Sequence, residues 1–377
     1  MIKISLTSVI VVSSLILLPL IGVFLAGEPL RRYLEFPPAT SYVEHAPFSW
    51  PLFFFLAFFI LAVLAPFVLR FLRYQKRTNR LISDSVQSER SKFPWWGWAG
   101  LFLIMVSWLL AWNRFSWFSP LQPYTYFPLW LGYILTVNGL CQSRTSESLL
   151  SRNPAFFLAL FPLSGVFWWY FEYLNRFVQN WHYLGIADFS TTEYVIHATV
   201  CFSTVLPAVL STKELLEGFP ALLRPFETWI PFDLFKESRG RKIAGLIFII
   251  IVLALVLLPL LPEYLFPFLW ISPLFILSGF QVLRGEKTIF APLKKGDWRI
   301  IVSSTLAALI CGFFWEMWNW QSLAHWEYSI SFVQRFHLFE MPILGYAGYL
   351  PFGLECVIVA QFFKKIADHE LKEIIHY

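Results

Sequence analysis

Apolar residues occur along this chain in ten stretches of about 20 residues, separated by shorter polar segments. A bilayer core about 30 Å thick is crossed by about 20 residues of α-helix, so each stretch is predicted to be a transmembrane helix. The predicted spans are residues 4–26, 48–69, 95–113, 124–141, 154–174, 191–210, 243–262, 264–282, 300–320 and 342–362. The spans 124–141 and 264–282 are the shortest and contain proline, which lipid helices tolerate where neighbouring groups satisfy the freed backbone.

The first stretch has a second interpretation, a secretory signal peptide, because Lys3 precedes its apolar run. The run is longer than is usual for a signal peptide, and no A-x-A cleavage site follows it. We therefore expect a first transmembrane helix at this position.

Composition supports the same fold class. Hydrophobic residues make up 57% of the chain and charged residues 14%, a balance that a water-exposed surface of this size does not carry. We therefore expect an all-α integral membrane protein surrounded by membrane lipids. The formal net charge of +5 does not indicate nucleic-acid binding, because the basic residues lie in short loops rather than on one compact face. The four cysteines lack C-x-x-C spacing, so neither a structural disulfide nor a zinc finger is expected.

The basic residues predict an orientation for these spans. If the chain starts inside, six segments lie in the cytoplasm and contain 24 of the 29 Lys and Arg residues. These segments are 1–3, 70–93, 142–153, 211–242, 283–299 and 363–377. The five basic residues left for the outside are Arg31, Arg32, Arg114, Arg176 and Arg335. The positive-inside rule therefore predicts a bacterial-type plasma membrane protein with both termini in the cytoplasm.

Trp-rich motifs recur about 144 residues apart along the chain. The sequence FWWYFEYLNRFVQNWHY at 167–183 corresponds to FFWEMWNWQSLAHWEY at 313–328, which aligns Glu172 with Glu316 and Asn175 with Asn319. The preceding motifs also correspond, FPLW at 127–130 with FPFLW at 266–270, and Asn138-Gly139 with Ser278-Gly279. We infer that a four-helix unit is duplicated.

The predicted organisation is two tandem parallel four-helix repeats preceded by two helices. In chain order it comprises 1–94 with two transmembrane helices and a basic cytoplasmic loop, repeat A at 95–212, a cytoplasmic interfacial linker at 213–242, repeat B at 243–362 and a cytoplasmic tail at 363–377. Because four is an even number, both repeats enter the membrane in the same direction. A pseudo-two-fold axis along the membrane normal is therefore expected.

Two cytoplasmic segments differ in character. The segment 73–92 is polar and is predicted to be a solvated linker. The segment 213–238 interleaves large apolar residues with charged ones, which suits either an interfacial segment lying on the inner leaflet or a loop packed against the bundle.

The segments WLGYILTVNGL at 130–140 and FEMPILGYAGYLPFGLEC at 339–356 resemble an uncharacterised group of Trp-rich polytopic bacterial membrane proteins with a duplicated E-x-x-N…W-x-Y unit. This resemblance implies no activity. The chain contains no aspartate-rich motif of isoprenoid transferases, no histidine box of membrane desaturases and no P-loop.

Glutamate and asparagine three residues apart lie on one helical face, so Glu172 with Asn175, and Glu316 with Asn319, are candidate catalytic groups. Ionisable groups in membrane helices are costly and therefore mark functional sites by default. Glu172 lies about 27 Å along its predicted span, close to the outer interface. A water-solvated polar rim beneath a belt of tryptophans is therefore the alternative interpretation.

The candidate substrate-binding residues lie near these carboxylates or where the chain re-enters the membrane. They are Trp168, Trp169, Trp181, His182, Trp315, Trp318, Trp326, Glu340 and Glu355. Glu355 lies deeper than the others and is expected to face the bundle interior, either in a proton relay or substrate contact or in a buried hydrogen bond between helices. Glu193 and His197 have a spacing compatible with two metal ligands, but a hydrogen-bonded structural pair is favoured and no metal site is predicted.

Three functions fit these patterns. The first is an intramembrane enzyme acting on a lipid or isoprenoid, with Glu172 and Glu316 as acid and base. The second is a transporter or lipid translocator built from the parallel repeat, and the third is an accessory subunit of a membrane complex. The enzyme is preferred because carboxylates coincide with dense aromatic residues at one leaflet, where tryptophans can hold an apolar substrate or stabilise a developing cation. The sequence indicates no particular cofactor or protein partner.

Overall fold

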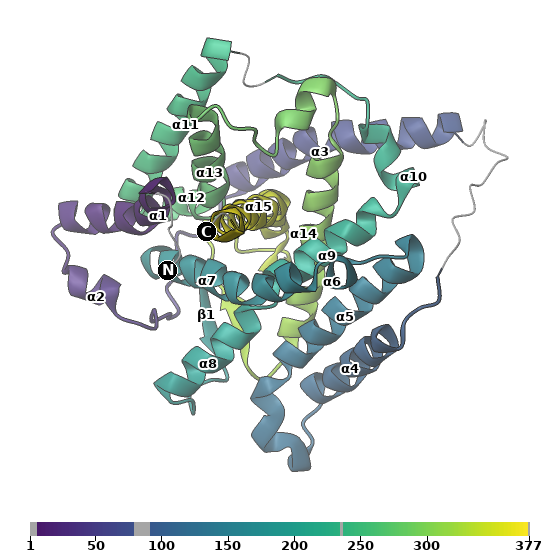
Figure 1. Cartoon of the computed structure of the whole chain (residues 1–377). Coiled ribbons are helices and arrows are strands. Elements are labelled where there is room, and N and C mark those ends of the chain that lie inside the picture. Colours follow the sequence, from purple (N-terminus) through teal and green to yellow (C-terminus); the bar gives the residue numbers. More distant parts are fainter. Residues whose placement is uncertain (1–5, 79–90, 234–236, 376–377) are drawn as a thin grey trace.

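The computed structural model describes residues 6–78, 91–233 and 237–375. It is mostly helical, with two short two-stranded sheets (Figure 1). The N-terminal part contains α1 (Leu6–Leu25), α2 (Leu30–Leu34) and α3 (Trp50–Thr78). The next part contains α4 (Trp95–Trp112), η1 (Ser116–Tyr124), α5 (Tyr126–Thr145), α6 (Leu149–Arg152), α7 (Pro154–Val178), β1 (Trp181–Leu184), α8 (Thr191–Phe202), α9 (Val205–Glu217), α10 (Pro220–Leu223) and η2 (Arg224–Phe226).

The C-terminal half repeats this alternation of long helices with short connections. It contains α11 (Glu237–Leu257), α12 (Pro262–Leu269), α13 (Ser272–Leu283), η3 (Ala291–Lys295), α14 (Arg299–Trp320), β2 (His325–Tyr328), β3 (His337–Leu338), β4 (Met341–Pro342), η4 (Ile343–Gly348) and α15 (Tyr349–Ile375). In Figure 1, α15 is viewed along its axis near the centre of the bundle.

Seven helices among the described residues are long and apolar enough to cross a membrane. The pair α12 and α13, bent by 59°, makes an eighth candidate if it forms one span. The expectation of a helical membrane protein is thus supported, and all eight candidates coincide with predicted stretches. The two other predicted stretches are also helical: α1 contains a shorter apolar helix, Ser13–Leu25, and α5 is a 20-residue helix outside these candidates.

The bend between α12 and α13 has a local cause. The chain leaves helical hydrogen bonding after Leu269 and resumes it at Ser272, next to Pro273. Proline has no N–H to donate and is favoured in the first turn of a helix. The predicted span 264–282 is therefore two helices rather than one.

The outer faces of the helices are apolar, as lipid requires. On α3, the side chains of Phe54, Phe55 and Phe58 are 61%, 64% and 74% exposed. Water would make such a surface unfavourable, whereas the hydrocarbon core of a bilayer does not.

Small residues let several helices approach closely. A Cβ atom added to Gly132 of α5 would lie 2.8 Å from the carbonyl oxygen of Gly100 in α4, and one on Gly22 of α1 would meet the carbonyl oxygen of Val256 in α11. Helix pairs in membranes pack through such small residues.

The loops predicted to lie on the outer side of the membrane contact one another at one end of the bundle. Arg176 donates to the carbonyl of Tyr33, and Arg114 Nη2 donates to the carbonyl of Gln321 over 2.8 Å. Loops that follow α1, α4, α7 and α14 therefore lie on the same side.

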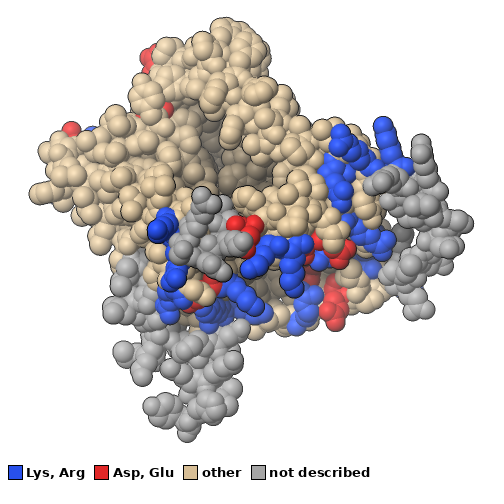
Figure 2. Space-filling model, turned by 90° about the horizontal axis from the view of Figure 1, so that it is seen from above, with Lys and Arg blue, Asp and Glu red and all other residues tan. Residues whose placement is uncertain are grey.

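The segments predicted to be cytoplasmic contact one another at the other end. Arg144 Nε donates to the carbonyl of Gly218 over 2.6 Å, Arg70 Nε to that of Pro225 over 2.8 Å, and Lys365 Nζ lies 2.6 Å from Glu286. Figure 2 shows Lys and Arg side chains gathered in a band across the lower part of the face in view, while the upper part carries few charges. We call this end of the bundle, where the predicted cytoplasmic segments meet, the basic side.

The segment 213–238 packs against the bundle over its described residues. Leu223 and Phe226 are buried, and the backbone N–H groups of Trp229 and Phe232 donate to the carbonyls of Gly296 and Leu293. The segment therefore contacts the bundle, while the side chains of Phe219, Ile230 and Phe232 remain exposed, as an interfacial segment would have them. In the other polar segment, α3 continues to Thr78, and 79–90 lie outside the described residues.

Candidate functional site

A two-stranded antiparallel sheet joins the two halves of the chain. Strand β1 follows α7, strand β2 follows α14, and Trp181 pairs with Tyr328 while Tyr183 pairs with Trp326. Side chains in these strands therefore come from corresponding places in the two predicted repeats.

Glu172 lies near the C-terminal end of α7, where its side chain is fully buried. Its Oε1 accepts hydrogen bonds from Trp168 Nε1 (3.0 Å), Trp181 Nε1 (3.0 Å) and the Tyr183 hydroxyl (2.6 Å). Three donors on one oxygen make up for much of the water that this carboxylate lacks. Its Oε2 is buried and has no partner among the described residues.

Glu316 holds the corresponding place in α14 and is also fully buried. Its Oε1 accepts from the hydroxyls of Tyr328 (2.8 Å) and Tyr349 (2.5 Å), and Trp326 Nε1 donates to the Tyr328 oxygen (2.8 Å). Within the described part of the chain its Oε2 also lacks a partner. The water-solvated rim is therefore not what the structure shows, because neither carboxylate reaches solvent.

Asn175 and Asn319 hold the ends of the strands in place. Asn175 Nδ2 donates to the carbonyl of Trp181 (2.8 Å), and Asn319 Nδ2 donates to the carbonyl of Trp326 (2.7 Å). Each side-chain oxygen accepts from the backbone N–H of the same strand residue, at 3.4 Å and 2.8 Å respectively. Because the backbone engages both ends of each amide, these residues position the strands rather than face a ligand.

A cavity of about 100 Å³ lies between the two carboxylate clusters. Its lining includes Ile186, Ala324 and His325, in the loops opposite the basic side. We call it the aromatic cavity, and its aromatic wall consists of Tyr126, Trp168, Trp181, Tyr183, Tyr194, Phe202, Trp270, Trp315, Trp326, Tyr328 and Tyr349.

The hydrogen-bond donors to both carboxylates are also wall residues of this cavity. Each carboxylate therefore lies directly behind a tyrosine that borders the open space. Burial, and next to it the adjacent carboxylate, raise the pKa values of Tyr183 and Tyr328 well above the ordinary value for tyrosine. Both hydroxyls consequently keep their protons at neutral pH.

The predicted substrate-binding residues divide into two groups. Trp168, Trp181, Trp315 and Trp326 line the aromatic cavity. The remaining predicted tryptophans lie elsewhere: Trp169 Nε1 donates to Thr199 (2.9 Å), and Trp318 is buried against Trp130.

The other three predicted residues do not line the cavity. His182 Nε2 lies 3.9 Å from Glu327, and its ring meets Tyr42 edge-on. Glu340 lies in the outer loop near the same carboxylate, and burial, followed by the charge of Glu327, raises its pKa.

Glu355 is fully buried at the contact between α15 and α13. It accepts from the backbone N–H of Leu274 over 3.3 Å, which agrees with the buried helix-to-helix hydrogen bond considered from the sequence.

Glu193 and His197 lie on one face of α8 and serve different contacts. The Tyr124 hydroxyl donates to Glu193, whereas the His197 ring packs edge-on against Tyr124 and Phe189 and borders the aromatic cavity. In the described part of the chain, no group of three or more His, Cys, Asp or Glu side chains could hold a metal ion.

Sequence analysis missed several wall residues. Tyr349 at the start of α15, Tyr126 at the start of α5 and Trp270 after α12 come from helices far apart in the chain. The one available signal was their position at the outer end of an apolar stretch, which many other aromatic residues share.

Comparison of the chain with protein-family models, curated proteins and solved structures finds no match. The chemistry of the site must therefore be argued from its own groups. Two buried carboxylates, each reaching a cavity through a protonated tyrosine, can accept or return a proton without opening the cavity to bulk water.

Proposed function

We propose that this protein is a membrane enzyme that performs acid–base chemistry on the end of an apolar substrate, a lipid or an isoprenoid, that enters the aromatic cavity. The observation that carries the proposal is the shared role of Tyr183, Tyr328 and Tyr349, which line the cavity and donate to the buried carboxylates. A structural pair of carboxylates would not need its donors to face an open space.

The reaction that fits this arrangement is a proton shift within the substrate. As a proton leaves the substrate for the Tyr183 oxygen, the proton of that hydroxyl passes to Glu172, so the tyrosine remains neutral. On the opposite wall, protonation of Glu316 reverses its hydrogen bond with Tyr349, so that Glu316 gives its proton to the Tyr349 oxygen while the hydroxyl proton of Tyr349 passes to the substrate. No oxidant or reductant is required. After the product leaves, Glu172 returns its proton through Tyr183 to water in the cavity, and Glu316 takes one up through Tyr349, which restores both carboxylates.

The wall of the cavity favours a substrate with an apolar body that gains positive charge during the reaction. Indole and phenol faces attract cations, by about 2 kcal/mol or more where water is excluded. Trp270 and Trp315 border the cavity without donating to either carboxylate. One face of Trp270 stacks on Phe171, with ring centroids 5.3 Å apart, so only its other face can take this role.

Conservative substitutions test the proposal. Glu172→Gln and Glu316→Gln, singly and together, keep the shape of the site but remove its proton acceptors. Lipid extracts of cells expressing each variant, compared by mass spectrometry with wild type, should show a precursor accumulating in the double variant and in Tyr183→Phe. Glu44→Gln, an exposed change of the same type in the loop after α2, is the matched control and should reproduce the wild-type profile.

Identical lipid and pigment profiles for wild type and the double variant would overturn the proposal that the protein is an enzyme. The transporter alternative needs a cavity lined by Glu355, and neither the aromatic cavity nor the larger one described below includes that residue.

The proposed topology has ten crossings, with both termini on the basic side in the cytoplasm of a bacterial plasma membrane. The contacts support it, because the predicted outer loops meet at one end of the bundle and the basic loops at the other. The parallel duplication is supported by the matching bonds of Asn175 and Asn319 and by the corresponding positions of the two carboxylates.

A further inference from the structure

A larger cavity lies near the basic side, away from the aromatic cavity. It encloses about 1220 Å³ between α11, α13, α14, α15 and the segment 285–298. Its walls are apolar and include Ile247, Phe275, Val282, Ile301 and Leu354. Figure 2 looks down on the top of Figure 1, and the face in view has a hollow directly above the band of basic side chains. We call it the lateral cavity.

Cationic side chains outnumber anionic ones at its edge. Arg241, Lys287, Lys294 and Lys295 border the cavity, against Asp233 and Glu286. Lys294 pairs with Asp233 (3.4 Å), while Glu286 is paired outside the cavity by Lys365 and Arg284. Arg241, Lys287 and Lys295 have no ion-pair partner among the residues that the structure describes, so their charge is available to an anion.

A free polar group lies in the apolar wall. Ser278 of α13 is only 4% exposed and borders the lateral cavity, and its hydroxyl has no hydrogen-bond partner in the described chain. Buried hydroxyls are normally satisfied, because an unmade hydrogen bond costs about 1–3 kcal/mol. A ligand with an acceptor oxygen at this depth would satisfy Ser278.

In the first half of the chain, the position that corresponds to Ser278 is Asn138, which is fully buried and covered by other residues. Asn138 lies eight residues after Trp130, as Ser278 lies eight residues after Trp270. Its side chain donates to Ser211 (2.8 Å) and accepts from the backbone of Leu150 (3.1 Å), so α6 covers it.

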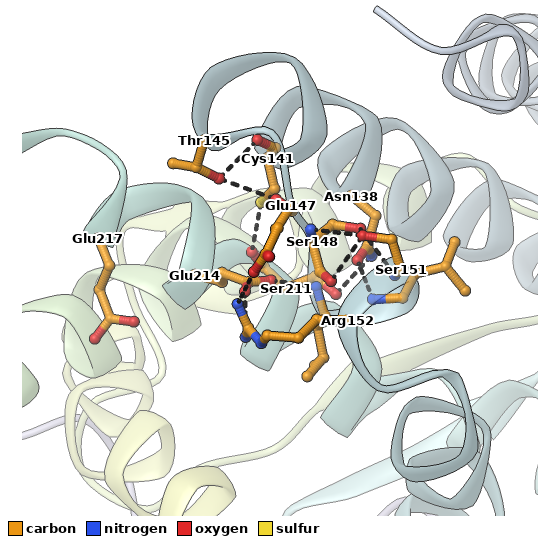
Figure 3. A network of polar contacts seen from close by, with 12 residues as sticks. Asn138, Cys141, Thr145, Glu147, Ser148, Ser151, Arg152, Ser211, Glu214 and Glu217 are labelled. Carbon is orange, nitrogen blue, oxygen red and sulfur yellow. Dashed lines mark hydrogen bonds and ion pairs between the residues drawn. The ribbon is translucent and has the colours of Figure 1, made fainter. Parts of the chain in front are cut away.

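Figure 3 shows the network that holds this cover in place. Glu214 of α9 accepts from the backbone N–H of Leu149 (2.6 Å) and from Arg152 (2.6 Å). After α13, the chain instead runs through η3, and Ser278 borders the lateral cavity. The lateral cavity is therefore a specific difference between the two halves.

We propose that the lateral cavity binds one anionic phospholipid from the leaflet on the basic side. Its phosphate lies at Arg241, Lys287 and Lys295, its acyl chains follow the walls formed by α11 and α13, and an ester oxygen accepts from Ser278. Basic side chains at the membrane interface attract anionic headgroups, and the volume exceeds the roughly 300–1,000 Å³ usual for a small-molecule site. The proposal does not depend on the reaction in the aromatic cavity.

Native mass spectrometry of the full chain, titrated in detergent with phosphatidylglycerol or phosphatidylcholine of the same acyl chains, tests the headgroup. Wild type should retain one phosphatidylglycerol with about ten-fold or greater preference. The triple variant Arg241→Gln, Lys287→Gln, Lys295→Gln should lose the preference. A control with the same charge change on the same side, Arg73→Gln, Lys76→Gln, Lys92→Gln, should keep it. Equal loss in both triple variants, or no preference in wild type, would overturn the proposal.

Ser278→Ala tests the depth of insertion separately. The variant should lose about two- to ten-fold affinity for the diester form of phosphatidylglycerol and none for the diether form, which lacks the carbonyl oxygens. Unchanged affinity for both forms would show that the lipid does not contact Ser278 in this wall. Added inorganic phosphate should not displace the lipid, and displacement would instead indicate a site for a free anion.

Discussion

Trp181 and Tyr328 are register partners across the sheet formed by β1 and β2, and each donates to a different buried carboxylate. Trp181 Nε1 donates to Glu172 over 3.0 Å, and the Tyr328 hydroxyl donates to Glu316 over 2.8 Å. A slip of one residue in this short ladder would turn the side chains of one strand to the opposite face relative to the other. The main-chain pairing thus fixes how the two carboxylate clusters lie relative to each other.

The strand anchors should be sensitive to truncation. Asn175→Ala or Asn319→Ala leaves backbone groups of the following strand without a partner, at a cost of about 1–3 kcal/mol. We expect a lower apparent Tm for each variant in nanodiscs. Asn113→Ala, which changes an exposed amide bonded to the Leu109 carbonyl, is the control. A Tm equal to that of wild type would show that the ladder does not need these amides.

The carboxylate clusters should tolerate an amide but not an alkyl group. Glu172→Gln keeps an oxygen that accepts from Trp168, Trp181 and Tyr183, whereas Glu172→Leu leaves three donors unsatisfied at about 1–3 kcal/mol each before relaxation. Denaturant unfolding in micelles should therefore rank wild type and Glu172→Gln well above Glu172→Leu. Similar midpoints for the leucine and glutamine variants would contradict the assigned hydrogen bonds.

The close approach of α4 and α5 should be intolerant of a side chain. In Gly132→Ala the new methyl group would lie 2.8 Å from the carbonyl oxygen of Gly100, and such overpacking costs about 1–3 kcal/mol. Gly245→Ala in α11 meets nothing within 4 Å and should gain up to about 1 kcal/mol from helix propensity. Opposite signs of the change in Tm are the expected result, and equal signs would argue against this packing.

Glu340 should make stability depend on pH. Its pKa is raised in the folded protein, first by burial and then by Glu327, so folding favours its protonated form. Stability is then lost as pH rises from the unfolded pKa, about 4.3, through the folded pKa. Glu340→Gln removes this loss and should raise Tm more at neutral pH than near pH 4. If Glu340→Gln changed Tm equally at both pH values, compared with the control Glu44→Gln, the pKa of Glu340 would not be raised in the folded protein.

Thiol labelling can test the two sides of the bundle. The four native cysteines are buried, so an impermeant reagent should report on introduced thiols at exposed positions. Asp188→Cys, between β1 and α8, should react in intact cells, while Glu147→Cys, near the basic side, should react only after the membrane is broken. The reverse pattern would invert the proposed orientation.

The sequence predicts the membrane helices well because apolar runs such as 48–69 report directly on the length needed to cross lipid. The break within 264–282 was less accessible, since Pro267 and Pro273 are also compatible with one continuous span. Within the site, Glu172 and Trp181 were both candidates from the sequence, and the structure brings them together in a hydrogen bond of 3.0 Å. The contact of Glu316 with Tyr349 could not be predicted, because aromatic residues are 20% of the chain and their pattern does not show which of them meet.

Each buried carboxylate takes all its donors from its own half of the chain. The most distant donor to Glu172 is 11 residues away and the most distant donor to Glu316 is 33 residues away. During synthesis, the first cluster can therefore assemble as soon as β1 has emerged, long before α14 exists. A nascent chain threaded into the bilayer can therefore supply three donors to Oε1 of Glu172 before its second half is made.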